Sequence, residues 1–144
     1  PPRHRPFDFL RDDYLPSIRG YLEHGERTVV TTQRYEQLQQ ERRDAGRLLA
    51  DWLTANDLDA LVEPTLPIVA RPRGHGYDAP FTDVAEISLT HYWNWVGFPV
   101  VALPSGVGAR SGLPTSVSLI GAPGADWDLL AWGAALQAEL GVLT

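Results

Sequence analysis

The side chains that most often carry chemistry in proteins are few and scattered in this sequence. Its 144 residues include no cysteine and four histidines, His4, His24, His75 and His91. No two of these histidines stand four positions apart, as a zinc site built on one helix would require, and the lack of cysteine removes thiolate ligands, thiolate nucleophiles and disulfides. The sequence therefore predicts no metal centre and no cofactor.

A complete serine hydrolase site is not predicted within the chain either. No Gly-x-Ser-x-Gly motif occurs, and all 12 cationic side chains are arginine. A serine nucleophile needs a base within hydrogen-bond reach, so the absence of lysine excludes a Ser–Lys mechanism contained in this chain. The glycine pair at Gly106 and Gly108 leads into an expected strand, whereas a dinucleotide-binding motif opens a helix. We expect no catalytic residue here.

Charge and hydropathy exclude several classes of partner. The net charge of −6 argues against binding to nucleic acid, because phosphate contacts need a local excess of cationic side chains. No apolar run approaches the ~20 residues of a membrane span, and the N-terminal residues lack the apolar core of a signal peptide. The apolar fraction of 44% is enough for a folded core. These features predict a cytoplasmic protein that does not contact a membrane.

The elements that would have to position any site alternate between helix and strand. A stripe of side chains spaced three or four apart predicts a long amphipathic helix over 33–55, formed by Tyr35, Leu38, Arg42, Ala45, Leu49 and Trp52. We further expect a strand over 58–63 stopped by Pro64, a loop over 64–80, a helix over 83–95, strands over 98–103 and 115–120, and a final helix over 126–140 with Asp126 as its N-cap.

This order of elements predicts an α/β fold that is incomplete by itself. The strand over 98–103 is apolar throughout, which is typical of a strand covered on both faces and paired on both edges. Three strands can hardly provide that cover, so we expect the chain to complete a larger sheet. We divide it into residues 1–31, a linker with short helices, and residues 32–144, a segment of a larger domain.

Two stretches resemble a known family. Thr-His-Tyr-Trp-Asn-Trp-Val-Gly-Phe-Pro at 90–99 runs into an apolar strand and Pro-Ser-Gly, and Gly-Leu-Pro at 112–114 opens a strand that ends in Gly121. Upstream, the strand over 58–63 leads into Pro-Thr-x-Pro at 64–67. The pattern over 30–141 resembles the C-terminal third of amidase signature hydrolases. The resemblance implies the C-terminal part of that fold, a mixed sheet covered by helices. In many members glutamine stands where this chain has Ser118.

The resemblance also implies a function. Members of the family hydrolyse amides, that is carbon–nitrogen bonds, with a Ser–Ser–Lys triad that lies upstream of the matched segment. We therefore expect this chain to be inactive alone. The implied partners are the N-terminal catalytic portion of the same enzyme and a small amide substrate. A homodimer stays open as a further way to cover an unpaired sheet edge.

The same resemblance implies that this segment forms one wall of the substrate site. We expect substrate contacts at Thr90, Trp93 and Gly97, around the expected helix before the strand at 98–103, and at Thr65 in the proline-rich loop. Trp93 and Trp95 stand two apart and cannot share a helix face, so we expect one to pack inward and the other to line the pocket. Trp52 and Trp132 are predicted to be core residues.

Two other functions remain open from the sequence. The first is a component of a glutamine- or asparagine-dependent amidotransferase, which would form a stable complex with a partner protein and show tRNA-dependent activity. The second is a non-catalytic scaffold fragment, which would stay inactive when mixed with any upstream portion.

Overall fold

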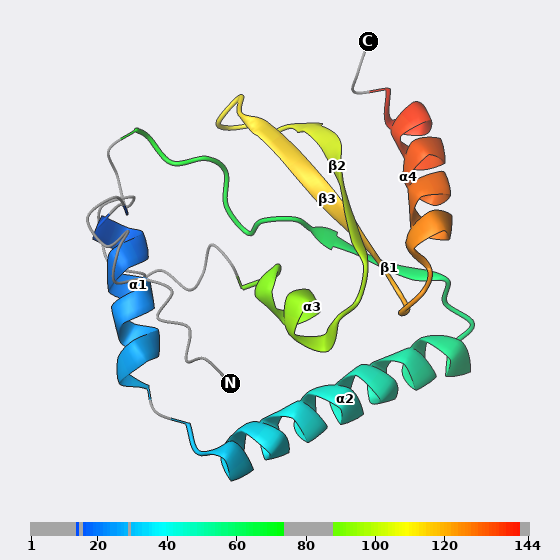
Figure 1. Ribbon diagram of the computed structural model, residues 1–144. Coiled ribbons are helices and arrows are strands. Elements are labelled where there is room, and N and C mark those ends of the chain that lie inside the picture. Colours follow the sequence, from blue (N-terminus) through cyan, green and yellow to red (C-terminus); the bar gives the residue numbers. More distant parts are fainter. Residues whose placement is uncertain (1–13, 15, 29, 74–87, 142–144) are drawn as a thin grey trace.

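The computed structural model describes residues 14, 16–28, 30–73 and 88–141. Four helices and three strands follow one another along these residues (Figure 1): α1 (Pro16–Arg27), α2 (Thr32–Ala55), β1 (Ala60–Pro64), α3 (His91–Val96), β2 (Val100–Val107), β3 (Pro114–Gly121) and α4 (Asp126–Leu140).

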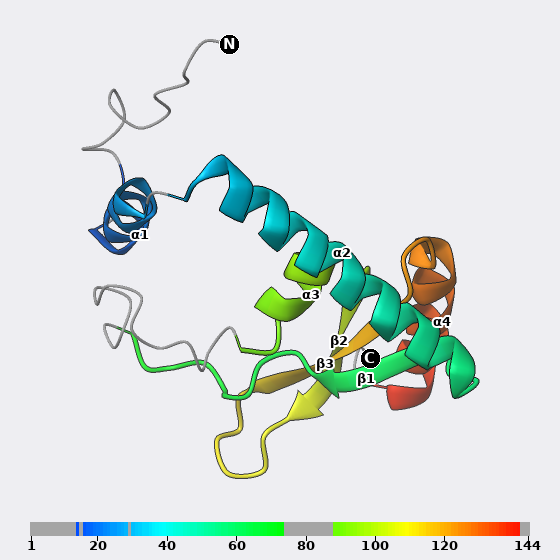
Figure 2. The same cartoon turned by 90° about the horizontal axis from the view of Figure 1, so that it is seen from below.

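The three strands form one antiparallel sheet in the order β1-β3-β2. β3 lies in the centre, and its Ser118 stands opposite Glu63 of β1 on one side and Ala102 of β2 on the other. Helices α2 and α3 cover one face of the sheet, and α4 packs against β2 and β3 from the other face (Figures 1 and 2). Helix α1 lies apart from the sheet in both views. The α/β fold class expected from the sequence is confirmed.

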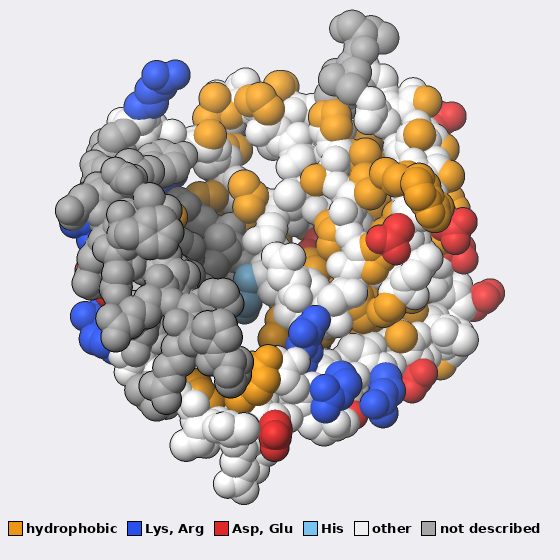
Figure 3. Space-filling view, viewed as in Figure 1, with side chains coloured by type: hydrophobic (Ala, Val, Ile, Leu, Met, Phe, Trp, Pro, Cys, Tyr) orange, Lys and Arg blue, Asp and Glu red, His pale blue; other side chains and the backbone are white. Residues whose placement is uncertain are grey.

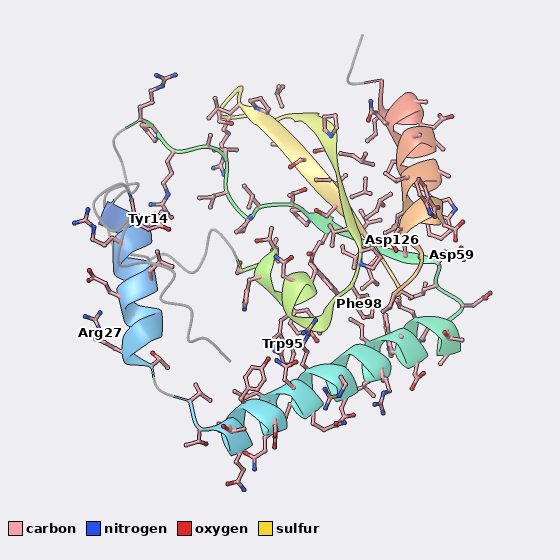
Figure 4. The ribbon with its side chains drawn as sticks, in the orientation of Figure 1. Tyr14, Arg27, Asp59, Trp95, Phe98 and Asp126 are labelled. Carbon is pink, nitrogen blue, oxygen red and sulfur yellow. The ribbon has the colours of Figure 1, made fainter. Side chains whose placement is uncertain are left out.

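The first core cluster lies between the sheet and α2 with α3. It consists of Leu53, Val96, Phe98 and Ile120. Phe98 is placed in it because α3 ends at Gly97, whose φ of 79° turns the chain sharply towards β2. The label in Figure 4 places Phe98 at this turn, above α2. A residue with a side chain adopts that φ only at a cost, which explains why glycine stands there.

The second core cluster lies under α4. It consists of Leu103, Leu119 and Leu129, with Leu136 packed against it. Gly133 faces the sheet at the middle of α4, where an added Cβ would lie 3.2 Å from Val101 Cγ1. The absence of a side chain therefore lets α4 approach β2 closely. The structure buries Gly133, whereas Trp132 is 37% exposed, so the prediction that Trp132 is a core residue is wrong.

Helix α2 begins one residue before the predicted helix and ends where predicted, at Ala55. The Thr31 hydroxyl accepts the N–H of Arg34 at 3.2 Å and caps the first turn. The predicted stripe is partly wrong, because Leu53 is the buried residue of the last turn and Trp52 is 48% exposed. Gly46, also buried, brings α2 against α3, since its Cβ would lie 3.2 Å from the Val96 carbonyl oxygen.

Each strand ends later than the sequence predicts, and β1 and β2 also begin two residues later, at Ala60 and Val100. Pro64 belongs to β1, although we expected it to stop the strand. The N–H of Thr65 donates to the Ser116 carbonyl at 3.1 Å, so Pro64 lies where a strand residue directs its N–H away from β3, and its missing donor costs no pairing. Likewise β2 continues to Val107 through a bulge between Pro104 and Gly106.

Coverage of β2 and two helix starts also differ from expectation. β2 is an edge strand of the described sheet, and Val100 is 40% exposed instead of covered on both faces. Of the helix predicted over 83–95, residues 83–87 lie outside the described residues, residues 88–90 form a turn, and α3 starts at His91. The N-cap of α4 is Ala125, without a side-chain hydrogen bond, so Asp126 is the first helical residue.

Candidate functional site

Glu63 and Trp93 join β1 to α3. The indole N–H of Trp93 donates to Oε1 of Glu63, and the contact is half-buried. Glu63 lies near the end of β1, and α3 is only six residues long. One charge-assisted hydrogen bond therefore fixes the orientation of a large ring on a short helix.

Thr65 and Ser118 form a second polar pair beside the first. Ser118 Oγ donates to Thr65 Oγ1 at 2.9 Å, and Ser118 is 3% exposed. Because Ser118 is the direct cross-strand partner of Glu63, their side chains lie on the same face of the sheet. The four polar groups, from Glu63, Thr65, Trp93 and Ser118, thus gather on the α3 side of the sheet.

Aromatic rings extend the site along α3. Trp93 packs against Phe98 at a centroid separation of 6.1 Å, and Tyr92 meets it edge-on at 5.3 Å. Tyr92 also lies 5.8 Å from the ring of Trp95, which is 40% exposed. Trp93 is therefore the inward-facing tryptophan of the pair, and Trp95, labelled on α3 in Figure 4, is the more exposed one.

The surface next to these strands is concave. Figure 3, in the orientation of Figure 1, shows the molecule hollowed beside the sheet, while cationic side chains gather at the lower edge, over α2. Within the part of the chain that the structure describes, no group of three or more His, Cys, Asp or Glu side chains could hold a metal ion. None of the described helices combines the length and the apolar character needed to cross a membrane.

The structure brings together two of the four residues predicted to bind substrate. Trp93 is hydrogen-bonded to Glu63 and Thr65 to Ser118, and Glu63 and Ser118 are cross-strand neighbours on the same face of the sheet. Thr90 is the residue before α3, and its carbonyl accepts the amide of Asn94 at 3.2 Å. Gly97 ends α3 and lies beside Arg42 of α2, with Nη2 at 3.4 Å from the position that a Cβ would take. For all four, substrate contact stays a prediction.

Glu63 and Ser118 were not predicted as site residues. The sequence pattern predicts Glu63 only as the end of a short strand and Ser118 only as a departure from a family glutamine. The signal for both is their cross-strand pairing, which joins residues more than fifty positions apart and has no local pattern in the sequence. The acidic residue at the end of an otherwise apolar strand was the one available hint.

Sequence comparison finds similarity to subunits of glutamyl-tRNA(Gln) amidotransferases. A glutamyl-tRNA(Gln) amidotransferase subunit from Jannaschia sp. (strain CCS1) is 35% identical over 91 residues, which are 63% of this chain and 18% of that protein. The subunit of the same name from Exiguobacterium sp. (strain ATCC BAA-1283 / AT1b) is 37% identical over 65 residues, 45% of this chain and 13% of that protein. No protein-family model matches the chain.

Structural comparison covers more of the chain. A crystal structure of an amidase matches 90% of it with a TM-score of 0.71 and 31% identity. A chain from a vestigial protein complex, described as revealing the origins of an s-triazine catabolic enzyme, matches 90% with a TM-score of 0.65 and 29% identity. The chain spans 30% and 28% of those two chains. From the shared fold and sequence, we conclude that the chain belongs to the amidase signature family.

Proposed function

We propose that this chain is a segment of an enzyme that hydrolyses amide bonds and that it forms one wall of the substrate site. The observation that carries the proposal is the match of 90% of the chain to a solved amidase at 31% identity. The chain spans less than a third of that amidase, so the remainder of such an enzyme lies outside this sequence.

The catalytic groups of the proposed enzyme lie outside this chain as well. The amidase signature resemblance implies a serine that attacks the amide carbonyl, releases the amine and is then freed from the acyl group by water. A lysine would serve in the proton transfers of that mechanism, and this sequence contains none. The chain thus depends on the N-terminal catalytic portion of the same enzyme and is inactive alone.

The role left to this segment is to bind and orient a small amide substrate. Trp93 packs inward but is only half-buried, so it offers part of its ring, held by Glu63, and Thr65 offers a hydroxyl held by Ser118. Thr90 and Gly97, at the two ends of α3, complete the proposed wall. Such positioning speeds a reaction because the bound substrate has already lost its translational and rotational freedom before the chemical step. The cytoplasmic location expected from the sequence remains part of this proposal.

A serine-directed fluorophosphonate probe tests the proposal on the complete enzyme. We expect one serine to be labelled, turnover of simple aryl amides to stop with labelling, and peptide mapping to place the label outside the 144 residues. A label on a serine of this chain, or amide hydrolysis by the isolated 15.9 kDa chain, would contradict it.

A second candidate is supported by the curated relatives, because both matches are subunits of glutamyl-tRNA(Gln) amidotransferases. In this alternative the enzyme releases ammonia from glutamine inside a larger assembly. The discriminating experiment is to purify the complete enzyme with its stable partners and measure glutamine hydrolysis with and without tRNA. A stimulation by tRNA favours the amidotransferase; equal activity by a partner-free enzyme favours the amidase.

A further inference from the structure

The Glu63 carboxylate is the one charged group of the four polar groups at the candidate site. It accepts a hydrogen bond from the neutral indole of Trp93. The ion pairs Arg34–Glu41 and Arg47–Asp44 lie on α2, and among the described residues Glu63 contacts the indole of Trp93 and not a cationic side chain. A carboxylate offers about four lone-pair sites, so a single neutral donor leaves most of its accepting capacity for another group.

Burial makes this unused capacity significant. Glu63 is half-buried, and its sheet neighbour Ser118 is buried and donates to Thr65 rather than to the carboxylate. A partly desolvated carboxylate is stabilised most by a cation, because the Coulomb attraction grows as water is excluded. The local chemistry therefore favours binding of a positively charged group over a neutral one.

Aromatic rings near the carboxylate also favour a cationic group. Glu63 accepts from the N–H at the edge of the Trp93 indole, and Tyr92, which is 38% exposed, lies edge-on to Trp93 at 82° and 5.3 Å. The faces of such rings attract ammonium and guanidinium groups through their quadrupoles. A carboxylate combined with indole and phenol rings is thus suited to a cation, while the Thr65 hydroxyl next to it can bind neutral polar atoms of the same molecule.

We infer that Glu63 determines specificity by binding an ammonium or guanidinium group of the substrate at the sheet face beside Trp93. The inference rests on the proposed amidase function and narrows its substrate class to amides that carry a positive charge. Glu63 takes no part in the bond-breaking steps. It selects the substrate, and Trp93 holds its carboxylate in place.

The test compares two substrates of equal length in the complete enzyme. One is an aryl amide of an ω-amino acid, and the other is the matching unbranched neutral acyl amide. Glu63→Gln keeps the size of the side chain and an oxygen that can accept from Trp93. We expect the ratio of kcat/KM for the cationic substrate to that for the neutral one to fall about 10- to 100-fold, as loss of a hydrogen bond between charged groups implies.

Two further variants separate charge recognition from a structural role. Trp93→Phe removes the indole donor that holds the Glu63 carboxylate but keeps its charge, so the preference for the cationic substrate should fall less than in Glu63→Gln. Asp128→Asn removes a charge from exposed α4, far from the site, and should leave the ratio unchanged. An equal fall for both substrates in Glu63→Gln would overturn the inference, because it would show that the carboxylate only supports the fold.

Binding provides a readout that does not depend on turnover. We expect benzylamine to bind the complete enzyme more tightly than benzyl alcohol by calorimetry, and Glu63→Gln to abolish the difference. If the enzyme hydrolyses no amide yet shows this difference, the proposed function fails and the cation site stands. If it hydrolyses neutral amides and shows no preference for benzylamine, the cation site fails and the proposed function stands.

Discussion

The hydrogen bond from Ser118 to Thr65 ties the chain just beyond β1 to the centre of the sheet. Ser118→Ala would leave the Thr65 hydroxyl without its donor, and we expect the free energy of unfolding of the complete enzyme to fall by about 1 kcal/mol. Urea denaturation measures the change. Thr65→Val and the double variant complete a cycle, and additive effects of the two substitutions would contradict a direct bond.

Trp93 is predicted to affect substrate choice and not stability alone. Trp93→Ala removes a ring that contacts Phe98 and Tyr92, so it should change the ratio of kcat/KM between a large and a small acyl amide. Thermal denaturation is measured in parallel. The control is Trp127→Ala, a tryptophan of α4, the helix on the opposite face of the sheet from Trp93, and it should leave the substrate ratio unchanged. A Trp93→Ala enzyme with lower Tm and an unchanged substrate ratio would remove Trp93 from the substrate site.

At residue scale, the sequence could not predict contacts between residues that lie far apart in the chain and meet only when the strands pair. It indicated Trp93 and Thr65, but not Glu63 and Ser118, the two residues that hold them. It also left open which of Trp93 and Trp95 faces inward. Two residues two positions apart on a single short helix have no periodicity to distinguish them, so only the packing against Phe98 decides.

At the level of elements, the turn that ends α3 determines where Trp93 and Phe98 lie. Gly97 adopts φ 79°, and a Cβ there would incur the left-handed penalty of about 1–2 kcal/mol. Gly97→Ala should therefore lower the free energy of unfolding by about that amount. Gly25→Ala provides a matched control, because Gly25 lies in α1 with nothing within 4 Å of its Cβ position. There the same change should stabilise the helix by up to about 1 kcal/mol; equal effects at both glycines would contradict the argument.

Helices were predicted more accurately than strands for a physical reason. α2 and α4 carry their own signals, namely the Thr31 cap, the Gly141 terminus and an apolar spacing that repeats over several turns. Strand limits depend on the neighbouring strand. Pro64 and Pro104 look like strand ends in the sequence. Each, however, occupies a strand position whose backbone nitrogen faces away from β3, so the missing N–H costs no pairing. Only the register reveals this.

At the scale of the whole molecule, α4 is apolar on more than the face that it buries. Leu129 is buried against the sheet, while Leu130 is 51% exposed and Trp127 is exposed as well. An apolar helix with both faces covered is typical of the interior of a larger protein. The solved amidase is about three times as long as this chain, and we propose that the remainder of the amidase fold covers α4.

Leu130→Asp tests this cover. In the complete enzyme it should cost about 1.5–3 kcal/mol in unfolding free energy, the value of a buried leucine side chain, and more for the unpaired charge. Asp128→Asn, an exposed neighbour on the same helix, is the matched control and should change stability little. A Leu130→Asp enzyme as stable as the control would show that this face of α4 stays in water.

The sheet contains one strand pair that is close in sequence, β2 and β3, and one that is distant in sequence, β1 and β3. This difference in separation affects the order of folding. β2 and β3 meet across a short link, with Val107 opposite Pro114, whereas β1 and β3 bring Ala60 to Gly121. Closing the longer loop of about sixty residues costs more chain entropy, so the hairpin of β2 and β3 should form first and β1 should dock late. Glu63 and Thr65 arrive with β1, while Ser118 is already in place in the hairpin. Substitutions at the Thr65–Ser118 contact should then mainly accelerate unfolding and leave the folding rate almost unchanged.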